Sequence, residues 1–193
     1  MLRNICFLFI LMAVPIGALG GENDMTAPIT IVSFQDDLGQ WTVVNDGVMG
    51  GVSRSRITRT EQGTGLFTGR VSLEFNGGFA SVRTKLPSQD LSAFEGVEIR
   101  VKGNGRTYQL RFRNDAQFDG AAYAADFPTT AGEWTTLRIP FADFQPTFRG
   151  RLLKDYPPLD QSALRQLTFM IADKKAGPFR LEIDWVRTYK PLD

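Results

Sequence analysis

The segment at residues 41–53, WTVVNDGVMGGVS, constrains the fold of this chain more than any other part of it. Two short β-prone pieces flank a turn that is rich in turn-forming residues. Five of them lie in a row of seven, with Met49 inside it: Asn45, Asp46, Gly47, Gly50 and Gly51. Asn, Asp and Gly tolerate positive φ or cap a turn with their own side chains. A plain hairpin needs two such residues, so five of them prescribe the backbone path closely.

The rest of the chain after residue 28 alternates between short apolar runs and turns. Residues 66–75 predict a strand with Phe67, Val71, Leu73 and Phe75 on one side. Further strands are predicted at 29–34, 79–86, 97–101, 108–112, 123–127, 134–139, 167–171 and 179–189. Strands of this length, with turn signals every 8–12 residues or so, are typical of an all-β sandwich or barrel. The longest stretch without a clear strand is 145–160.

The N-terminal segment predicts export. Arg3 supplies a positive start, residues 5–16 are almost wholly apolar, and Ala18-Leu19-Gly20 resembles a cleavage site. We therefore predict a signal peptide at 1–20, a flexible lead-in at 21–28, one domain at 29–190, and a periplasmic or extracellular location. The alternative is an uncleaved membrane anchor, although the apolar run is short for a span of about 20 residues.

The composition removes several classes of function. The chain has no His, and its one Cys, Cys6, lies in the predicted signal. This excludes Ser-His-Asp and Cys-His catalysis and His-bound zinc. Removing Arg3 with the signal leaves 21 cationic and 21 anionic side chains, which argues against nucleic acid as a partner. We predict a binding protein, not an enzyme, with no cofactor and with membrane contact only through an uncleaved signal.

Four motifs in order resemble the complex I intermediate-associated protein 30 family. Residues 41–53 match W-x-x-V-N-D-G-V-M-G-G-x-S throughout, and 105–108 match Gly-Arg-x-Tyr. The third motif runs from Trp134 to Arg151 and the fourth from Gly177 to Trp185. The resemblance implies a galactose-binding-like jelly-roll β-sandwich of two antiparallel sheets. It also implies a chaperone-like assembly factor whose partner is a protein, a respiratory or envelope complex subunit. An exported domain could not reach the matrix or cytoplasmic arm of complex I, so the partner stays open.

Two loops are candidate binding sites. Successive backbone N–H groups at 45–51 could form a nest for an anion or a carbonyl group. The alternative is a structural turn in which Met49 plugs the core and Asp46 bonds its own turn. The second loop is 145–160, where Tyr156 stands beside two prolines and is predicted to be exposed.

A basic sheet face is a third candidate. Strand periodicity places pairs of cations on one side of three predicted strands. They are Arg83 with Lys85, Arg100 with Lys102, and Arg111 with Arg113. If these strands are neighbours, six cations cover one face, which suits an acidic polysaccharide, a phosphate-bearing lipid or an acidic protein patch. The alternative is an ordinary solvated face.

Carboxylates and aromatic residues offer further alternatives. If the terminal strands pair, four carboxylates come together: Asp36, Asp37, Glu182 and Asp184. They could then form a calcium site or a glycosidase pair, or they could act as ordinary hydrogen-bond acceptors. Four aromatic residues could instead be exposed and stack on sugar rings: Trp41, Tyr123, Trp134 and Tyr156. The leading interpretation is a non-catalytic assembly factor, and the alternative is an exported carbohydrate-binding module that binds a glycan.

Overall fold

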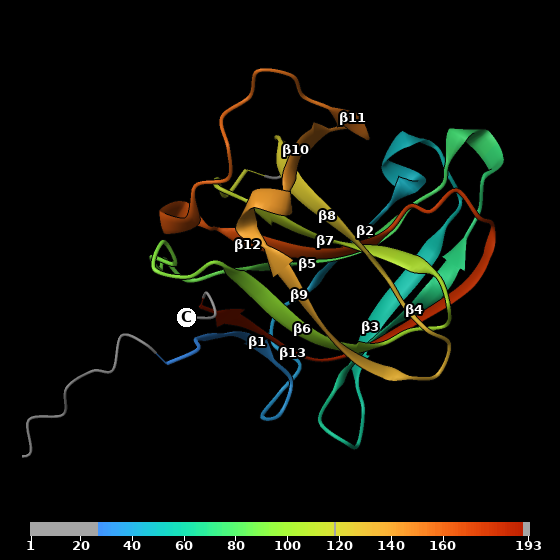
Figure 1. The fold of residues 1–193 in the computed structure, drawn as a ribbon. Coiled ribbons are helices and arrows are strands. Elements are labelled where there is room, and N and C mark those ends of the chain that lie inside the picture. The colour runs from blue at the N-terminus through green and yellow to red at the C-terminus, as the bar shows by residue number, and fades with distance from the viewer. Residues whose placement is uncertain (1–26, 118, 191–193) are drawn as a thin grey trace, which may run out of the picture.

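The computed structural model describes residues 27–117 and 119–190, which form two antiparallel sheets packed face to face (Figure 1). The first sheet has the order β3-β4-β13-β6-β9, and β1 also pairs with β13. Its strands are β1 (Thr30–Ser33), β3 (Arg54–Arg59), β4 (Gly65–Val71), β6 (Gly96–Lys102), β9 (Trp134–Pro140) and β13 (Gly177–Tyr189). The predicted all-β sandwich of two antiparallel sheets is confirmed.

The second sheet has the order β11-β10-β8-β7-β12-β5-β2. Its strands are β2 (Thr42–Asn45), β5 (Ala80–Lys85), β7 (Thr107–Arg113), β8 (Ala122–Pro128), β10 (Gln145–Phe148), β11 (Arg151–Leu152) and β12 (Gln166–Ile171). Four short 3-10 turns join the strands of the described part: η1 (Asp46–Met49), η2 (Glu74–Asn76), η3 (Phe141–Asp143) and η4 (Gln161–Ala163).

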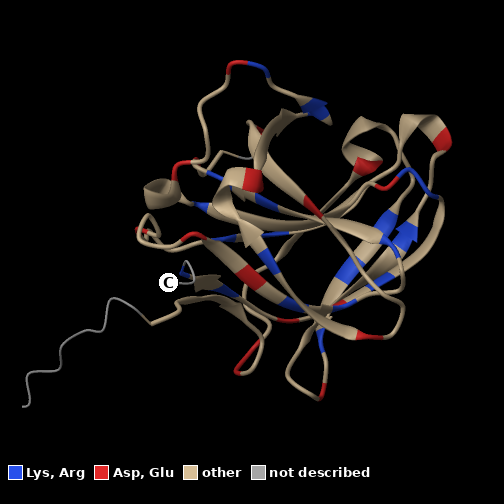
Figure 2. Cartoon of the chain, viewed as in Figure 1, with Lys and Arg blue, Asp and Glu red and all other residues tan. Residues whose placement is uncertain are grey.

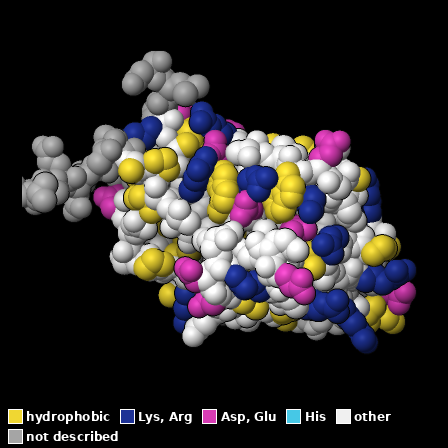
Figure 3. All heavy atoms as spheres, turned by 90° about the horizontal axis from the view of Figure 1, so that it is seen from below, with side chains coloured by type: hydrophobic (Ala, Val, Ile, Leu, Met, Phe, Trp, Pro, Cys, Tyr) yellow, Lys and Arg dark blue, Asp and Glu magenta, His cyan; other side chains and the backbone are white. Residues whose placement is uncertain are grey.

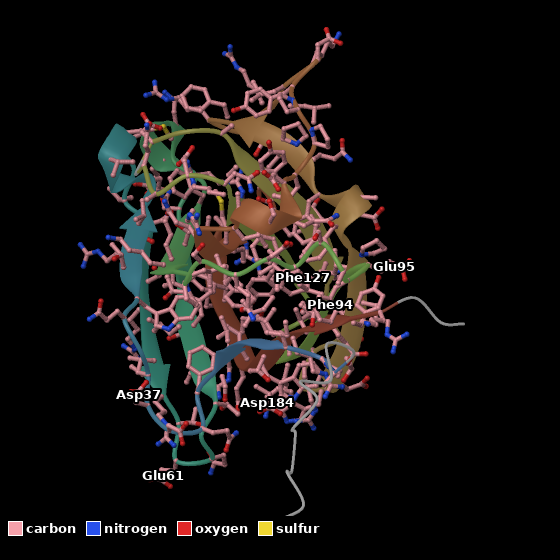
Figure 4. All side chains as sticks on the ribbon, turned by 90° about the vertical axis from the view of Figure 1, so that its left-hand side faces the viewer. Asp37, Glu61, Phe94, Glu95, Phe127 and Asp184 are labelled. Atoms are coloured by element: carbon pink, nitrogen blue, oxygen red, sulfur yellow. The ribbon has the colours of Figure 1, made fainter. Side chains whose placement is uncertain are left out.

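The core lies between the two sheets and is rich in aromatic residues. Period-two alternation points one side chain in two inward from each central strand. Phe34, Phe67, Phe112, Phe127 and Phe169 are almost wholly inaccessible to solvent. Figure 4 shows Phe127 within the sandwich. Burial of a large apolar side chain contributes about 1.5–3 kcal/mol, so this layer is a main source of stability.

The strand predicted at 66–75 is too long. Strand β4 ends at Val71, and the chain then enters η2, where Phe75 and Asn76 have positive φ angles of 53° and 58°. The reason is tertiary: the Ser72 N–H donates to Ser53 Oγ (2.9 Å), which ties the chain to the segment after η1. Leu73 and Phe75 therefore face solvent instead of the core.

The predicted loop at 145–160 contains a hairpin formed by β10 and β11. Thr147 pairs with Leu152 and Phe148 with Arg151, so Arg149 and Gly150 form a two-residue turn. Both have positive φ, 48° and 75°, as the turns that suit the strand twist require. The sequence signal was a single Gly in this turn, which was too weak to predict a hairpin.

The predicted signal peptide at 1–20 and most of the lead-in at 21–28 lie outside the described residues. Within 27–117 and 119–190, no helix has the length and apolar character needed to cross a membrane.

Candidate functional site

The outer face of the second sheet carries a groove of about 530 Å³. Its floor is formed by β5, β12 and β7. One wall is made by η1 and η2, which lie side by side, and the other by the β10–β11 hairpin (Figure 1). The volume falls in the range of ligand-binding pockets. We call this feature the groove.

Strand register brings three arginines together on the floor of the groove. Thr168 of β12 pairs with Arg83 of β5 on one side and with Arg111 of β7 on the other. Adjacent strands lie about 4.8 Å apart, which places the Arg83 and Arg111 backbones about 10 Å apart in one row. Arg113, two residues further along β7, faces the same side. The predicted cationic face exists here for these three residues and for Lys85, which lies two residues from Arg83 on β5 but is exposed and outside the groove lining.

The two arginines of β7 are held by polar groups of the groove walls. Arg113 is buried and its Nη1 donates to the Gly120 carbonyl oxygen at 2.6 Å. Arg111 Nη2 donates to Thr147 Oγ1, and its Nη1 lies 3.0 Å from Met170 Sδ. The Nε of Arg111 is buried without an acceptor among the described residues. The Arg111 side chain therefore spans the floor with part of its hydrogen-bonding capacity unused.

Electrostatics in the groove disfavours three neighbouring charges. Burial, with added repulsion from Arg113 and Arg83, lowers the pKa of Arg111 to about 10. The pKa values of Arg113 and Arg83 are also below their ordinary value, mainly because of burial. Arg111 remains protonated near pH 7, since its pKa lies well above that value. The groove is thus a fixed positive site at physiological pH.

Asp46 fixes the wall that contains η1. Its side chain is completely buried and accepts hydrogen bonds from Ser53 N (2.9 Å), Ser53 Oγ, Gly78 N (2.7 Å) and Phe79 N (3.3 Å). Burial alone would raise the pKa of Asp46, but these donors together hold it below its ordinary value. Asp46 therefore joins two loops, whereas the sequence alternative had it bonding only its own turn.

The turn at 45–51 presents apolar side chains to solvent. Val48 and Met49 are 68% and 56% exposed, and Leu73 and Phe75 of the neighbouring loop are 47% and 69% exposed. We call these four residues the apolar rim. The alternative in which Met49 plugs the core is wrong, because Asp46 takes the inward position of this turn.

The amides of the same turn are partly used within it. Gly50 N donates to the Gly47 carbonyl oxygen and Gly51 N to that of Asp46. Asp46 N donates to the Phe79 carbonyl oxygen, so three of the donors that an anion nest at 45–51 would need are engaged. Asn45 is also engaged, since its Oδ1 accepts from Ser55 Oγ at 2.7 Å.

The prediction that six cations share one face is wrong. Arg100 and Lys102 lie on β6, in the first sheet, so they face away from the groove. There they form ion pairs with Asp184 (2.5 Å) and Glu182 (3.0 Å) and lie 4.6 Å and 4.7 Å from the Trp134 ring. Figures 2 and 3 show cations and carboxylates interspersed on this sheet. Period two gave the side of each strand but could not assign strands to sheets.

The four candidate carboxylates do not form a metal site. Asp184 and Glu182 are paired with cations of β6, and Figure 4 shows Asp37 apart from Asp184. No group of three or more potential metal-ligating side chains occurs within 27–117 and 119–190. The glycosidase alternative receives no support from this arrangement.

The candidate sugar-stacking residues lie elsewhere than on the floor of the groove. Trp41 stacks on Phe34 with a centroid separation of 5.7 Å, and Tyr123 is buried with its hydroxyl donating to the Pro157 carbonyl oxygen. Tyr156 is exposed but packs beside Tyr123, outside the groove lining. The aromatic residues among the described lining are Phe79 and Phe148. Sequence reasoning missed Phe148 and Arg149 because the hairpin was not predicted.

Solved structures resemble the fold. A family 11 carbohydrate-binding module from Clostridium thermocellum, solved with a β-1,3-1,4-mixed-linked tetrasaccharide, aligns with a TM-score of 0.64. The alignment covers 87% of this chain and 98% of that chain at 16% identity. At this identity the likeness supports the jelly-roll β-sandwich and nothing about ligands.

Sequence relatives correct the predicted location. The chain is 27% identical to mouse complex I intermediate-associated protein 30, mitochondrial, over 80% of this chain and 53% of that protein. It therefore spans about half the length of the mouse relative. It is 29% identical to an uncharacterised protein of Schizosaccharomyces pombe over 75% of each chain. The predicted export is wrong, because the mouse relative is named as a mitochondrial protein.

The predicted export conflicted with the resemblance to a family of complex I assembly factors. This correction removes that conflict. The model of the family described as complex I intermediate-associated protein 30 matches residues 32–183, which include all four motifs apart from the last two residues of the fourth. The chain belongs to the complex I intermediate-associated protein 30 family.

Proposed function

We propose that this chain is a non-catalytic assembly factor that binds a protein partner during the formation of respiratory complex I. Family membership and the name of the mouse relative support this role. The observation that carries it is the apolar rim of Val48, Met49, Leu73 and Phe75 beside the groove. Exposed clusters of large apolar side chains on soluble domains mark interaction surfaces.

The energetics of the rim suit a protein partner. Complete burial of one such side chain contributes about 1.5–3 kcal/mol, so two or three buried residues give a substantial part of a micromolar affinity. Both rim loops are fixed by the hydrogen bonds to Asp46, which lowers the entropy lost on binding. The rim is therefore a rigid surface with apolar contacts to offer.

The test is complementation in cells of the source organism that lack this chain. We expect assembled complex I, resolved on native gels, to fall without the chain and to recover with the wild-type protein. A Met49→Glu, Leu73→Glu variant should accumulate to normal levels but fail to restore assembly. A Thr58→Glu, Thr136→Glu variant, with both charges on exposed positions of the first sheet, is the charge-matched control and should restore it. Normal complex I levels in the cells without the chain would overturn the proposal.

A second candidate function is glycan binding, because the groove lies on one sheet face of a fold shared with a carbohydrate-binding module. The lining argues against a neutral sugar, since its described residues include no Trp or Tyr. Titration calorimetry with the mixed-linked tetrasaccharide distinguishes the two functions. Saturable binding that is lost in Arg111→Met would favour the glycan.

A further inference from the structure

The groove contains more positive than negative side chains. Among its described lining residues, Arg83, Arg111 and Arg113 form the floor, Arg149 and Lys174 stand in the walls, and Asp119 is the one carboxylate. Asp119 is itself engaged with Arg149 at 3.0 Å across an exposed ion pair. Among the described lining residues the floor is therefore cationic, and the carboxylates that act on its arginines, Asp115, Asp119 and Asp126, stand beside it.

The cations of the floor lie close together in a partly desolvated place. Arg111 is largely removed from water and is repelled by Arg113 and Arg83, and only Asp126 offsets this among the described charges that act on it. Arg113 is also buried, but Asp115 and Asp119 stabilise its charge. Buried charges in proteins are normally paired, because desolvation of an unpaired charge is unfavourable. Arg111 Nε, which is buried and has no acceptor within 27–117 and 119–190, adds an unused donor at the same place. A carboxylate on the floor would offset the repulsion that Arg111 receives from Arg83 and Arg113.

The spacing of the arginines matches an extended peptide. Arg111 and Arg113 stand two residues apart on one strand, so their side chains emerge on one face about 7 Å apart. An extended peptide repeats its side chains on one face at the same interval. Carboxylates at alternate positions of such a peptide can each meet one guanidinium, and this pairing is often bidentate.

We propose that the groove binds an extended segment of the partner protein with acidic residues at alternate positions. Arg111 and Arg113 contact its carboxylates, while apolar side chains of the segment pack on Met49 and Phe148. This inference rests on the proposed function, because it specifies how the assembly factor recognises its protein partner. The apolar side chains of the lining favour a peptide over a phosphate or a polyuronate, which would bring no apolar groups to meet them.

The test uses a fluorescent hexapeptide that alternates Glu with Val or Leu, titrated with the full chain by fluorescence anisotropy. We expect saturable binding that weakens as the salt concentration rises. A control peptide in which Gln replaces each Glu should not bind. Arg111→Met and Arg113→Met should each weaken binding about tenfold or more, since each removes a charge-assisted hydrogen-bonded pair. Arg56→Met, exposed on the first sheet, removes the same charge and should bind as the wild type.

Two controls keep the outcomes separate. Thermal unfolding of Arg111→Met should show no loss of stability, because a buried repelling charge has been removed. Anionic vesicles and an oligouronate serve as competing probes. Failure of the peptide to bind, equal binding by the Arg111→Met variant, or preferential binding of vesicles or oligouronate would overturn the inference. None of these results would alter the complementation result, so the two proposals can fail independently.

Discussion

Replacing Asp46 by Asn tests whether this buried carboxylate holds the two rim loops together. The substitution keeps the shape of the side chain but exchanges one oxygen for an NH2 group. Asp46 Oδ1 accepts from Ser53 N, and Oδ2 accepts from Ser53 Oγ, Gly78 N and Phe79 N. Whichever way the amide turns, its NH2 group meets at least one N–H donor.

The magnitude follows from that clash of donors. Leaving one buried donor unsatisfied costs about 1–3 kcal/mol, and the remaining bonds weaken because the acceptor is no longer charged. We therefore expect Asp46→Asn to lower the free energy of unfolding by about 3 kcal/mol. For a domain of this size that corresponds to a fall of about 10 °C in the melting temperature. Asp37→Asn, an exposed carboxylate, is the matched control and should change little.

The pH dependence gives a second measurement. The pKa of Asp46 is lowered in the folded state, so its contribution is present above the pKa of the unfolded state and is lost as pH falls through the folded value. The stability difference between wild type and Asp46→Asn, from urea unfolding, should be largest above about pH 5 and shrink in acid. A difference below about 0.5 kcal/mol at pH 7, within the usual range of surface substitutions, would refute the reasoning.

Two further predictions use matched pairs of substitutions. A Cβ at Gly51 would lie 2.5 Å from Asp46 Oδ1, so Gly51→Ala should lower the free energy of unfolding by about 2–3 kcal/mol. A Cβ at Gly47 meets no atom within 4 Å, so Gly47→Ala should change that free energy by less than about 1 kcal/mol. Arg106→Lys should lower the free energy of unfolding by about 3 kcal/mol. Arg106 is buried, its Nε donates to Asp173 (2.9 Å), and its Nη1 donates to the carbonyl oxygens of Gly177 and Pro178. Arg149→Lys, whose ion pair is exposed, should cost less than about 1 kcal/mol. Melting curves decide both pairs, and equal effects within a pair would contradict the structural reading.

The extent to which the sequence predicts the fold depends on how local the signal is. The alternation in 97–101, 108–112 and 167–171 is sufficient for β6, β7 and β12, because the pattern and the pleat have the same period. The end of β4 could not be predicted in this way. Leu73 and Phe75 continue the alternation perfectly, and only the contact between Ser72 and Ser53 turns the chain aside.

The candidate site shows the same limit. That Arg111 and Arg113 share a side follows from period two alone. That Arg83 joins them while Arg100 does not depends on β12 lying between β5 and β7, with β6 in the other sheet. Strand order is a non-local property, and no pattern within a single strand encodes it. The hairpin wall was missed for a related reason, since its turn uses Arg149 at a positive φ that is uncommon for a non-Gly residue.

The segment at 45–51 combines the two roles that its sequence left as alternatives. Asp46 points inward and binds two loops, while Val48 and Met49 point outward on the same turn. Substitution of Asp46 should therefore lower stability first and disturb partner binding only through the position of the rim. Substitution of Arg111 should weaken binding without lowering stability, because it removes a cation whose charged form is disfavoured by burial and by the neighbouring arginines. If Asp46→Asn lowers the melting temperature while Arg111→Met lowers only binding, the structural role belongs to Asp46 beneath the rim and the recognition role to Arg111 on the floor of the groove.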